Sequence, residues 1–242
     1  MLRFFTKIRY NLAFENKPMK YLRYAIGEIL LVVIGILIAL QVNNLNHQRK
    51  DSILKQKYLK EINSDFLENK AQFENNFKEL NVYYEHIRTL RKQLPITNEN
   101  WSSMFQEFKF VFRTGWTFNP KISSIEGLIV SGNIHVIKND VLKKLILSFN
   151  DQFEDYREEE IRAENVVNIW QDIYLEESTL YRDNTKTTFP SDELKIKLEK
   201  LLIMRRDALA LLLSKWEVNK ESEELMQTID AIISLTDQEL MK

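Results

Sequence analysis

Ala25 to Val42 reads AIGEILLVVIGILIALQV, and this stretch decides the class of the protein. It carries a single charged residue, Glu28, and is apolar enough to enter a lipid bilayer. A helix of roughly 20 residues covers the bilayer's hydrocarbon core of about 30 Å. Tyr24 to Leu45 has that length, so we expect one transmembrane helix over residues 24–45.

Two other interpretations fit an apolar run near an N-terminus. The uninterrupted part, Ile29 to Leu40, is short enough to be a core helix of a soluble protein. A cleaved signal peptide also joins basic residues to an apolar core, but its basic region is short and its cleavage site has small residues. Here the basic region is over 20 residues long, and Ala39-Leu40-Gln41 offers no pair of small residues. The pattern therefore favours an uncleaved signal anchor.

Basic residues before the apolar run predict its orientation, because basic segments are retained in the cytoplasm. They are Arg3, Lys7, Arg9, Lys17, Lys20 and Arg23. We expect residues 1–23 to form a basic amphipathic leader that binds the anionic cytoplasmic membrane surface through these six residues. A disordered basic tail is the alternative. The protein would then lie in the cell inner membrane, with residues 46–242 in the periplasm.

The exported domain is expected to be all-α. Only 5 Gly and 4 Pro occur in 242 residues, so few tight turns are available. Apolar residues recur every three or four positions, which is typical of amphipathic helices. The expected helices cover residues 46–94, 101–112, 122–130, 139–181 and 191–242. The first would continue the transmembrane helix, unless it breaks near Asn43-Asn44 or Asn75-Asn76. Three long and two short helices predict an antiparallel bundle.

The run from Lys20 to Asn44, KYLRYAIGEILLVVIGILIALQVNN, resembles the N-terminal signature of an uncharacterised family of single-pass membrane proteins from Bacteroidota-type Gram-negative bacteria. The leader FFTKIRYNLAFENK and the stretch SGNIHVI at 131–137 are similar to that family too. Leu45 stands where the family usually has Trp. The resemblance implies an inner-membrane anchor and a helical exported domain, and it supplies no activity.

One face of the expected membrane helix combines small residues with its only acid. At 100° per residue this face holds Glu28, Val32, Gly35, Ala39, Val42 and Asn46. Small residues let another helix approach closely, and an acid on the same face is sheltered from lipid. We expect a helix–helix interface here, with a second copy or another membrane protein. Alternatively, Glu28 carries protons, or reaches Lys20 or Arg23 at the membrane surface.

Charge and motifs favour neither nucleic-acid binding nor catalysis. Six of the 34 Lys and Arg and two of the 35 Asp and Glu precede residue 43, so the exported part is mildly acidic. Nucleic acid requires a clustered basic face. Ser52-Ile53-Leu54-Lys55 matches the S-x-x-K motif of penicillin-binding enzymes, but chance explains it better, since no strands are expected.

Metal and cofactor sites are not expected either. The three histidines are scattered, and none follows a glutamate at the spacing of di-iron bundles. Glu158-Glu159-Glu160 are adjacent and point around the helix, so we interpret them as a solvated face.

We therefore expect a membrane-anchored, non-enzymatic envelope protein whose helical domain mediates assembly or protein interaction, without cofactors. Its expected partners are the lipid bilayer and either further copies of itself or another membrane protein. The alternative is a periplasmic ligand-sensing module that works through a partner protein, since helical bundles can bind solutes between their helices.

Overall fold

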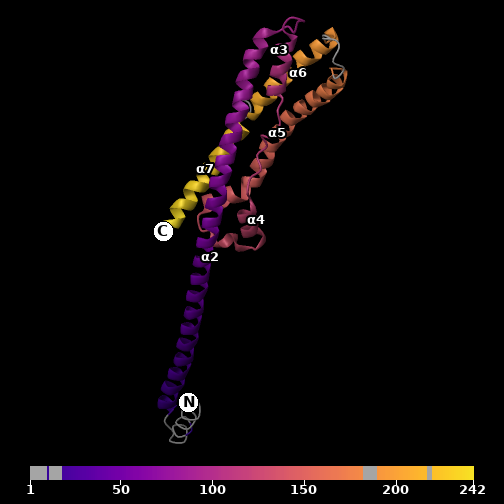
Figure 1. Ribbon diagram of the computed structural model, residues 1–242. Coiled ribbons are helices and arrows are strands. Elements are labelled where there is room, and N and C mark those ends of the chain that lie inside the picture. Colours follow the sequence, from indigo (N-terminus) through magenta and orange to yellow (C-terminus); the bar gives the residue numbers. More distant parts are fainter. Residues whose placement is uncertain (1–9, 11–17, 182–189, 217–219) are drawn as a thin grey trace. The chain divides into compact units, whose positions relative to one another are not determined.

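The structure is a computed structural model that describes residue 10 and residues 18–181, 190–216 and 220–242. These residues form helices, and no strand occurs among them, so the all-α prediction is confirmed. In chain order the elements are α2 (Pro18–Leu90), η1 (Arg91–Gln93), α3 (Trp101–Val111), α4 (Ser123–Val130), η2 (Asn133–Val136), α5 (Asp140–Tyr181), α6 (Asp192–Leu212) and α7 (Glu221–Leu240) (Figure 1). α2 passes through Asn43-Asn44 and Asn75-Asn76 without a break.

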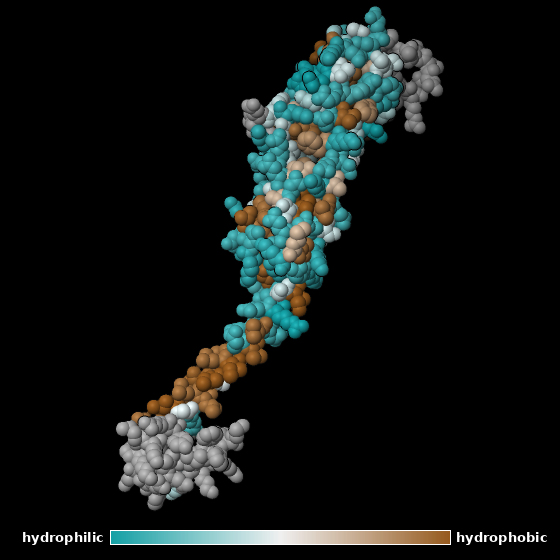
Figure 2. All heavy atoms as spheres, turned by 90° about the vertical axis from the view of Figure 1, so that its left-hand side faces the viewer, coloured by the Kyte–Doolittle hydropathy of each residue, from teal (hydrophilic) through white to brown (hydrophobic). Residues whose placement is uncertain are grey.

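The chain divides into two compact units, Met1–Lys55 and Gln56–Lys242. In the first unit the apolar part of α2 keeps its side chains on the surface: Leu31 is 64% exposed and Ile38 is 60% exposed. Hydrophobic residues gather over this part of the molecule (Figure 2). It is long and apolar enough to cross a membrane, and none of its apolar window is buried. A core helix of a soluble protein would bury these side chains, so that alternative does not fit.

The second unit is a bundle of four legs. The first leg is α2 from Gln56 onward. The second consists of α3, an extended connection at residues 112–122, and α4; the third is α5; and the fourth is α6 followed by α7.

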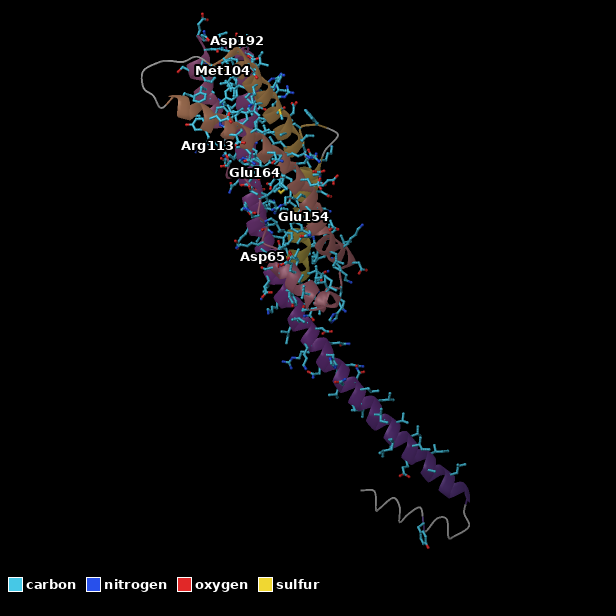
Figure 3. All side chains as sticks on the ribbon, turned by 90° about the vertical axis from the view of Figure 1, so that its right-hand side faces the viewer. Asp65, Met104, Arg113, Glu154, Glu164 and Asp192 are labelled. Carbon is cyan, nitrogen blue, oxygen red and sulfur yellow. The ribbon has the colours of Figure 1, made fainter. Side chains whose placement is uncertain are left out.

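Ring contacts show that the first and third legs run in the same direction. Phe66 packs edge-on against Phe149 with ring centroids 4.8 Å apart, and Phe73 packs against Tyr156 at 5.2 Å. Residue numbers therefore rise together along α2 and α5. In Figure 3, Glu164 accordingly lies nearer than Glu154 to the end of the unit that holds Met104.

The fourth leg runs the other way. Asn63 donates to the Thr236 hydroxyl at 2.9 Å, and Lys70 donates to Asp230 at 2.7 Å, so numbers fall along α7 as they rise along α2. Consecutive legs alternate in direction, which agrees with the expected antiparallel bundle.

Side chains from other legs hold the extended connection in place. Asn69 of α2 is 1% exposed, and its amide nitrogen donates to the Lys121 carbonyl oxygen at 2.9 Å. The Lys121 backbone N–H donates in return to the Asn69 Oδ1 at 2.7 Å. This reciprocal pair satisfies backbone groups that no helix or strand satisfies there.

Several helix ends follow from local sequence. Asn139 Oδ1 accepts hydrogen bonds from the backbone N–H groups of Val141 and Leu142, and so caps α5. The Ser191 hydroxyl accepts from the Leu194 N–H at 3.1 Å and caps α6. Gly132 has a φ of 71°, the left-handed conformation expected after α4.

The C-terminal stretch is two helices, so the prediction of one continuous helix over residues 191–242 was wrong. α6 ends at Leu212 and α7 begins at Glu221. Ser214 has a φ of 50°, which is uncommon for a residue other than glycine, asparagine or aspartate. Its hydroxyl hydrogen-bonds the Ser222 hydroxyl at 2.6 Å and links the two helices. No Gly or Pro marks this break in the sequence.

Candidate functional site

The six residues of the expected membrane-helix interface lie on one face of α2 in the first unit. They span about 80° around the helix at 100° per residue. Glu28 is partly exposed, and the other five positions are exposed. A Cβ added at Gly35 would meet no atom within 4 Å, so the face around this glycine is open in the single chain. Its use as an interface stays a prediction.

The residues expected to bind the membrane surface are mostly beyond what the structure describes. Arg3, Lys7, Arg9 and Lys17 lie outside the described residues. Lys20 and Arg23 lie in the first turns of α2, and their side chains are likewise outside the described part. Surface binding by the leader therefore stays a prediction as well.

A fully buried arginine connects three helices of the bundle. Arg205 of α6 has an exposed fraction of 0%. Its Nε donates to the Val111 carbonyl oxygen at 3.2 Å, and its Nη1 donates to that of Ala163 at 3.0 Å. Val111 is the last residue of α3, so the guanidinium lies at the negative end of that helix. The Arg205 Cζ also lies 5.2 Å from the centroid of the Trp116 ring, within the range of a cation–π contact.

Burial lowers the pKa of Arg205 to about 10, so the side chain stays charged at neutral pH. Nη2 has no hydrogen-bond partner among the described residues. Carbonyl oxygens and an aromatic ring thus stabilise this charge, and their positions in α3, α5 and the extended connection make Arg205 a structural crosslink.

Glu160 of α5 is a second buried ionisable group, 3% exposed. Its Oε1 accepts a hydrogen bond from the Phe118 backbone N–H at 2.9 Å, which joins α5 to the extended connection. Burial raises the pKa of Glu160 to about 7, although the Phe118 N–H, the Tyr156 hydroxyl and the charge of Arg157 all favour the ionised form. Its other oxygen, Oε2, is buried without a hydrogen-bond partner of normal geometry.

The interpretation of Glu158-Glu159-Glu160 as a solvated face was wrong for two of the three. Glu159 is 4% exposed and Glu160 is 3% exposed, whereas the Glu158 side chain is 71% exposed. The reason is that α5 is packed by several legs, so a wide arc of its surface is buried. The sequence does contain a signal, because Glu160 continues the three-and-four spacing of Phe153, Tyr156 and Ala163.

Two further polar pairs involve α2, one within the helix and one to α3. The Tyr83 hydroxyl donates to Glu79, one turn earlier in the same helix. The pKa of Tyr83 is raised to about 12, mainly by burial and to a smaller extent by the Glu79 carboxylate. His86 Nε2 hydrogen-bonds Glu107 of α3. Within the described residues, no three His, Asp or Glu side chains converge as metal ligands would.

A family model matches residues 28–167, and its description is a family of unknown function, DUF6090. The chain belongs to this family. Among curated proteins and among solved structures, no significant match was found.

Membership confirms the expectation of an uncharacterised domain family. The match begins at Glu28 in the apolar segment and ends at Val167 within α5, so it covers the membrane-helix face, the first two legs and the first part of the third. The Glu160 contact with Phe118 lies within it, and Arg205 lies beyond it. The Bacteroidota source and the signature from Lys20 stay predictions.

Proposed function

We propose that this member of the DUF6090 family is a single-pass protein of the cell inner membrane, without enzymatic activity of its own. Its helical bundle serves assembly with further copies or with another membrane protein. The observation that carries the proposal is the apolar segment from Ala25 to Val42, of which nothing is buried in this chain. An exposed apolar surface of this kind is stable in lipid and costly in water.

The proposed orientation has the N-terminus in the cytoplasm and the bundle in the periplasm. Six basic residues precede the apolar segment, with Glu15 as the only acid among them, and this bias supports it. The bundle, which starts at Gln56, carries more acidic than basic residues, so an anionic membrane surface does not attract it as a whole.

The assembly role draws support from the open face around Gly35. Gly35 and Ala39 would let a second helix approach closely, and Glu28 on the same face would be shielded from lipid by that helix. A structural role for the buried charges supports the absence of catalysis: Arg205 binds two carbonyl oxygens, and Glu160 binds a backbone N–H.

The proposal is tested by fractionation and by a reporter fused after Lys242. We expect the full chain to stay in the membrane fraction after an alkaline carbonate wash, and a reporter that works only in the periplasm to be active. Leu31→Arg with Ile34→Arg should release the chain or block its insertion, because each arginine at the centre of a span costs about 3 kcal/mol.

The matched control places two arginines at exposed apolar positions of the bundle. Leu67→Arg with Val82→Arg changes side chains that are each 50% exposed, and membrane association should be unaffected. Release of the parent chain without detergent, or activity only of a cytoplasmic reporter, would contradict the proposal.

A further inference from the structure

An apolar groove of about 390 Å³ lies between α2 and the first turns of α7 in the second unit. Phe73, Phe77 and Met226 supply its apolar surface. Phe73 is buried, whereas Phe77 and Met226 are partly exposed, so part of the apolar surface is open to solvent. The volume lies within the range of pockets that hold small molecules.

The charges around the groove are unevenly paired. Glu74 and Glu223 both line it. Glu74 lies 3.8 Å from the Lys70 ammonium, and Glu223 lies 3.9 Å from that of Lys220, so each acid has a basic neighbour outside the groove.

Lys78, which also lines the groove, has no ion pair among the described residues. Lys70 is shared, because it also donates to Asp230 at 2.7 Å, so three acids and three lysines lie in and beside the groove. Lys78 is the one of these lysines without an ion pair among the described residues. The hydroxyl of Ser222, another lining residue, is already engaged by Ser214. Among the described residues, the groove therefore presents apolar surface, two carboxylates that each have a lysine neighbour, and the unpaired ammonium of Lys78.

From this juxtaposition we infer that the groove binds a single-chain amphipathic anion, an alkyl carboxylate, with its chain over Phe73, Phe77 and Met226 and its head group beside Lys78. A carboxylate complements the unpaired ammonium, and the chain removes the exposed apolar surface from water. This site does not depend on the assembly role proposed above, and it would supply a ligand site for the sensing alternative.

The test uses the full chain in nanodiscs of phosphatidylethanolamine and phosphatidylglycerol. The probe is a dodecanoate that carries a photoreactive diazirine at its tail, and labelled peptides are mapped by mass spectrometry. We expect labelling of the peptides that contain Phe77 and Met226, and we expect excess dodecanoate to abolish it. Labelling of the apolar segment at 25–42, in contact with the bilayer, should not saturate.

Chain length and head group give two further readouts. Competition by octanoate, decanoate and dodecanoate should strengthen by up to roughly fourfold per methylene, until the chain outgrows the groove. Dodecanol, which lacks the charge, should compete less well than dodecanoate. A lysophospholipid that competes better than dodecanoate would overturn the assignment to a free alkyl carboxylate.

Substitutions test the roles of the Lys78 ammonium and of the apolar surface separately. Lys78→Gln should weaken saturable labelling roughly threefold, as expected for an exposed charge contact, and Lys78→Arg should keep it. Lys92→Gln removes the same charge at an exposed position outside the groove and should have no effect. Equal labelling of Lys78→Gln and the parent would overturn the assignment of the head-group site.

Met226→Trp should fill the groove and abolish saturable labelling. Its folding is checked by circular dichroism, and Gln227→Trp at the exposed rim provides a second blocking variant if the first fails to fold. Unchanged labelling in a folded blocking variant, or no saturable labelling in the parent, would overturn the site. Neither outcome bears on membrane anchoring, which the carbonate wash tests separately.

Discussion

Glu160 is a buried carboxyl on the packed side of α5, in line with Phe153, Tyr156 and Ala163. What keeps it inside is a backbone N–H from a segment 42 residues away in the chain. Arg205 is similar, since its partners are carbonyl oxygens, and main-chain partners leave no trace in side-chain identity.

Glu160→Gln is expected to change the pH dependence of folding stability. The pKa of Glu160 is raised from 4.5 to about 7 in the folded chain. The protonated Glu160 carboxyl therefore makes its full contribution to the free energy of unfolding below pH 4.5. This contribution is lost as the pH rises from 4.5 to about 7, and it does not change further above pH 7. Gln does not ionise, so the free energy of unfolding of the variant, relative to that of the parent, should rise by about 2 kcal/mol between pH 5 and pH 8.

The measurement is urea unfolding of the full chain in nanodiscs at both pH values, followed by tryptophan fluorescence. Glu158→Gln, at the exposed neighbour, is the control and should change stability by only a few tenths of a kcal/mol at either pH. A parent and Glu160→Gln variant with parallel pH profiles would contradict the expectation.

At the scale of elements, helix positions were largely predictable and one boundary was not. Asn139, Ser191 and Gly132 mark helix ends by well-known local chemistry, and the structure has ends at each of them. The break between α6 and α7 has no such marker. Ser214 adopts its positive φ beside the buried Leu212 and Leu213, where its hydroxyl reaches that of Ser222. These contacts depend on how the helices pack, so the local sequence does not reveal them.

Asn139→Ala should destabilise the bundle by about 1 kcal/mol, because two N–H groups of the first turn of α5 lose their acceptor. Asn150→Ala is the matched control, an exposed asparagine within the same helix. It should be neutral or slightly stabilising, since alanine has the higher helix propensity. Urea unfolding measures both, and equal effects of the two changes would argue against the cap.

At the scale of the whole molecule, the pattern of apolar residues predicted an all-helical chain, an apolar helix and alternating legs. It did not predict the groove between α2 and α7, because that depends on how residues about 150 positions apart are brought together. The membrane-helix face is different again. Its residues share a side by helical periodicity alone, so the structure adds only that the face around Gly35 is open.

Gly35→Ile is expected to weaken assembly in the membrane, since a branched side chain would keep a partner helix at a distance. Gly27→Ile is the control, because an added Cβ also meets no atom there and Gly27 lies off the predicted face. Crosslinking in native membranes, followed by sizing, should show a smaller species or loss of the co-purified partner for Gly35→Ile alone. Equal behaviour of the two variants would count against the interface.

The extended connection has a consequence for how the bundle opens. The Lys121 and Phe118 amides are protected from solvent by Asn69 of α2 and by Glu160 of α5, rather than by a repeating ladder. Their exchange with deuterium is therefore governed by the separation of this segment from two different helices. These two amides act as natural reporters of the moment at which the second leg detaches.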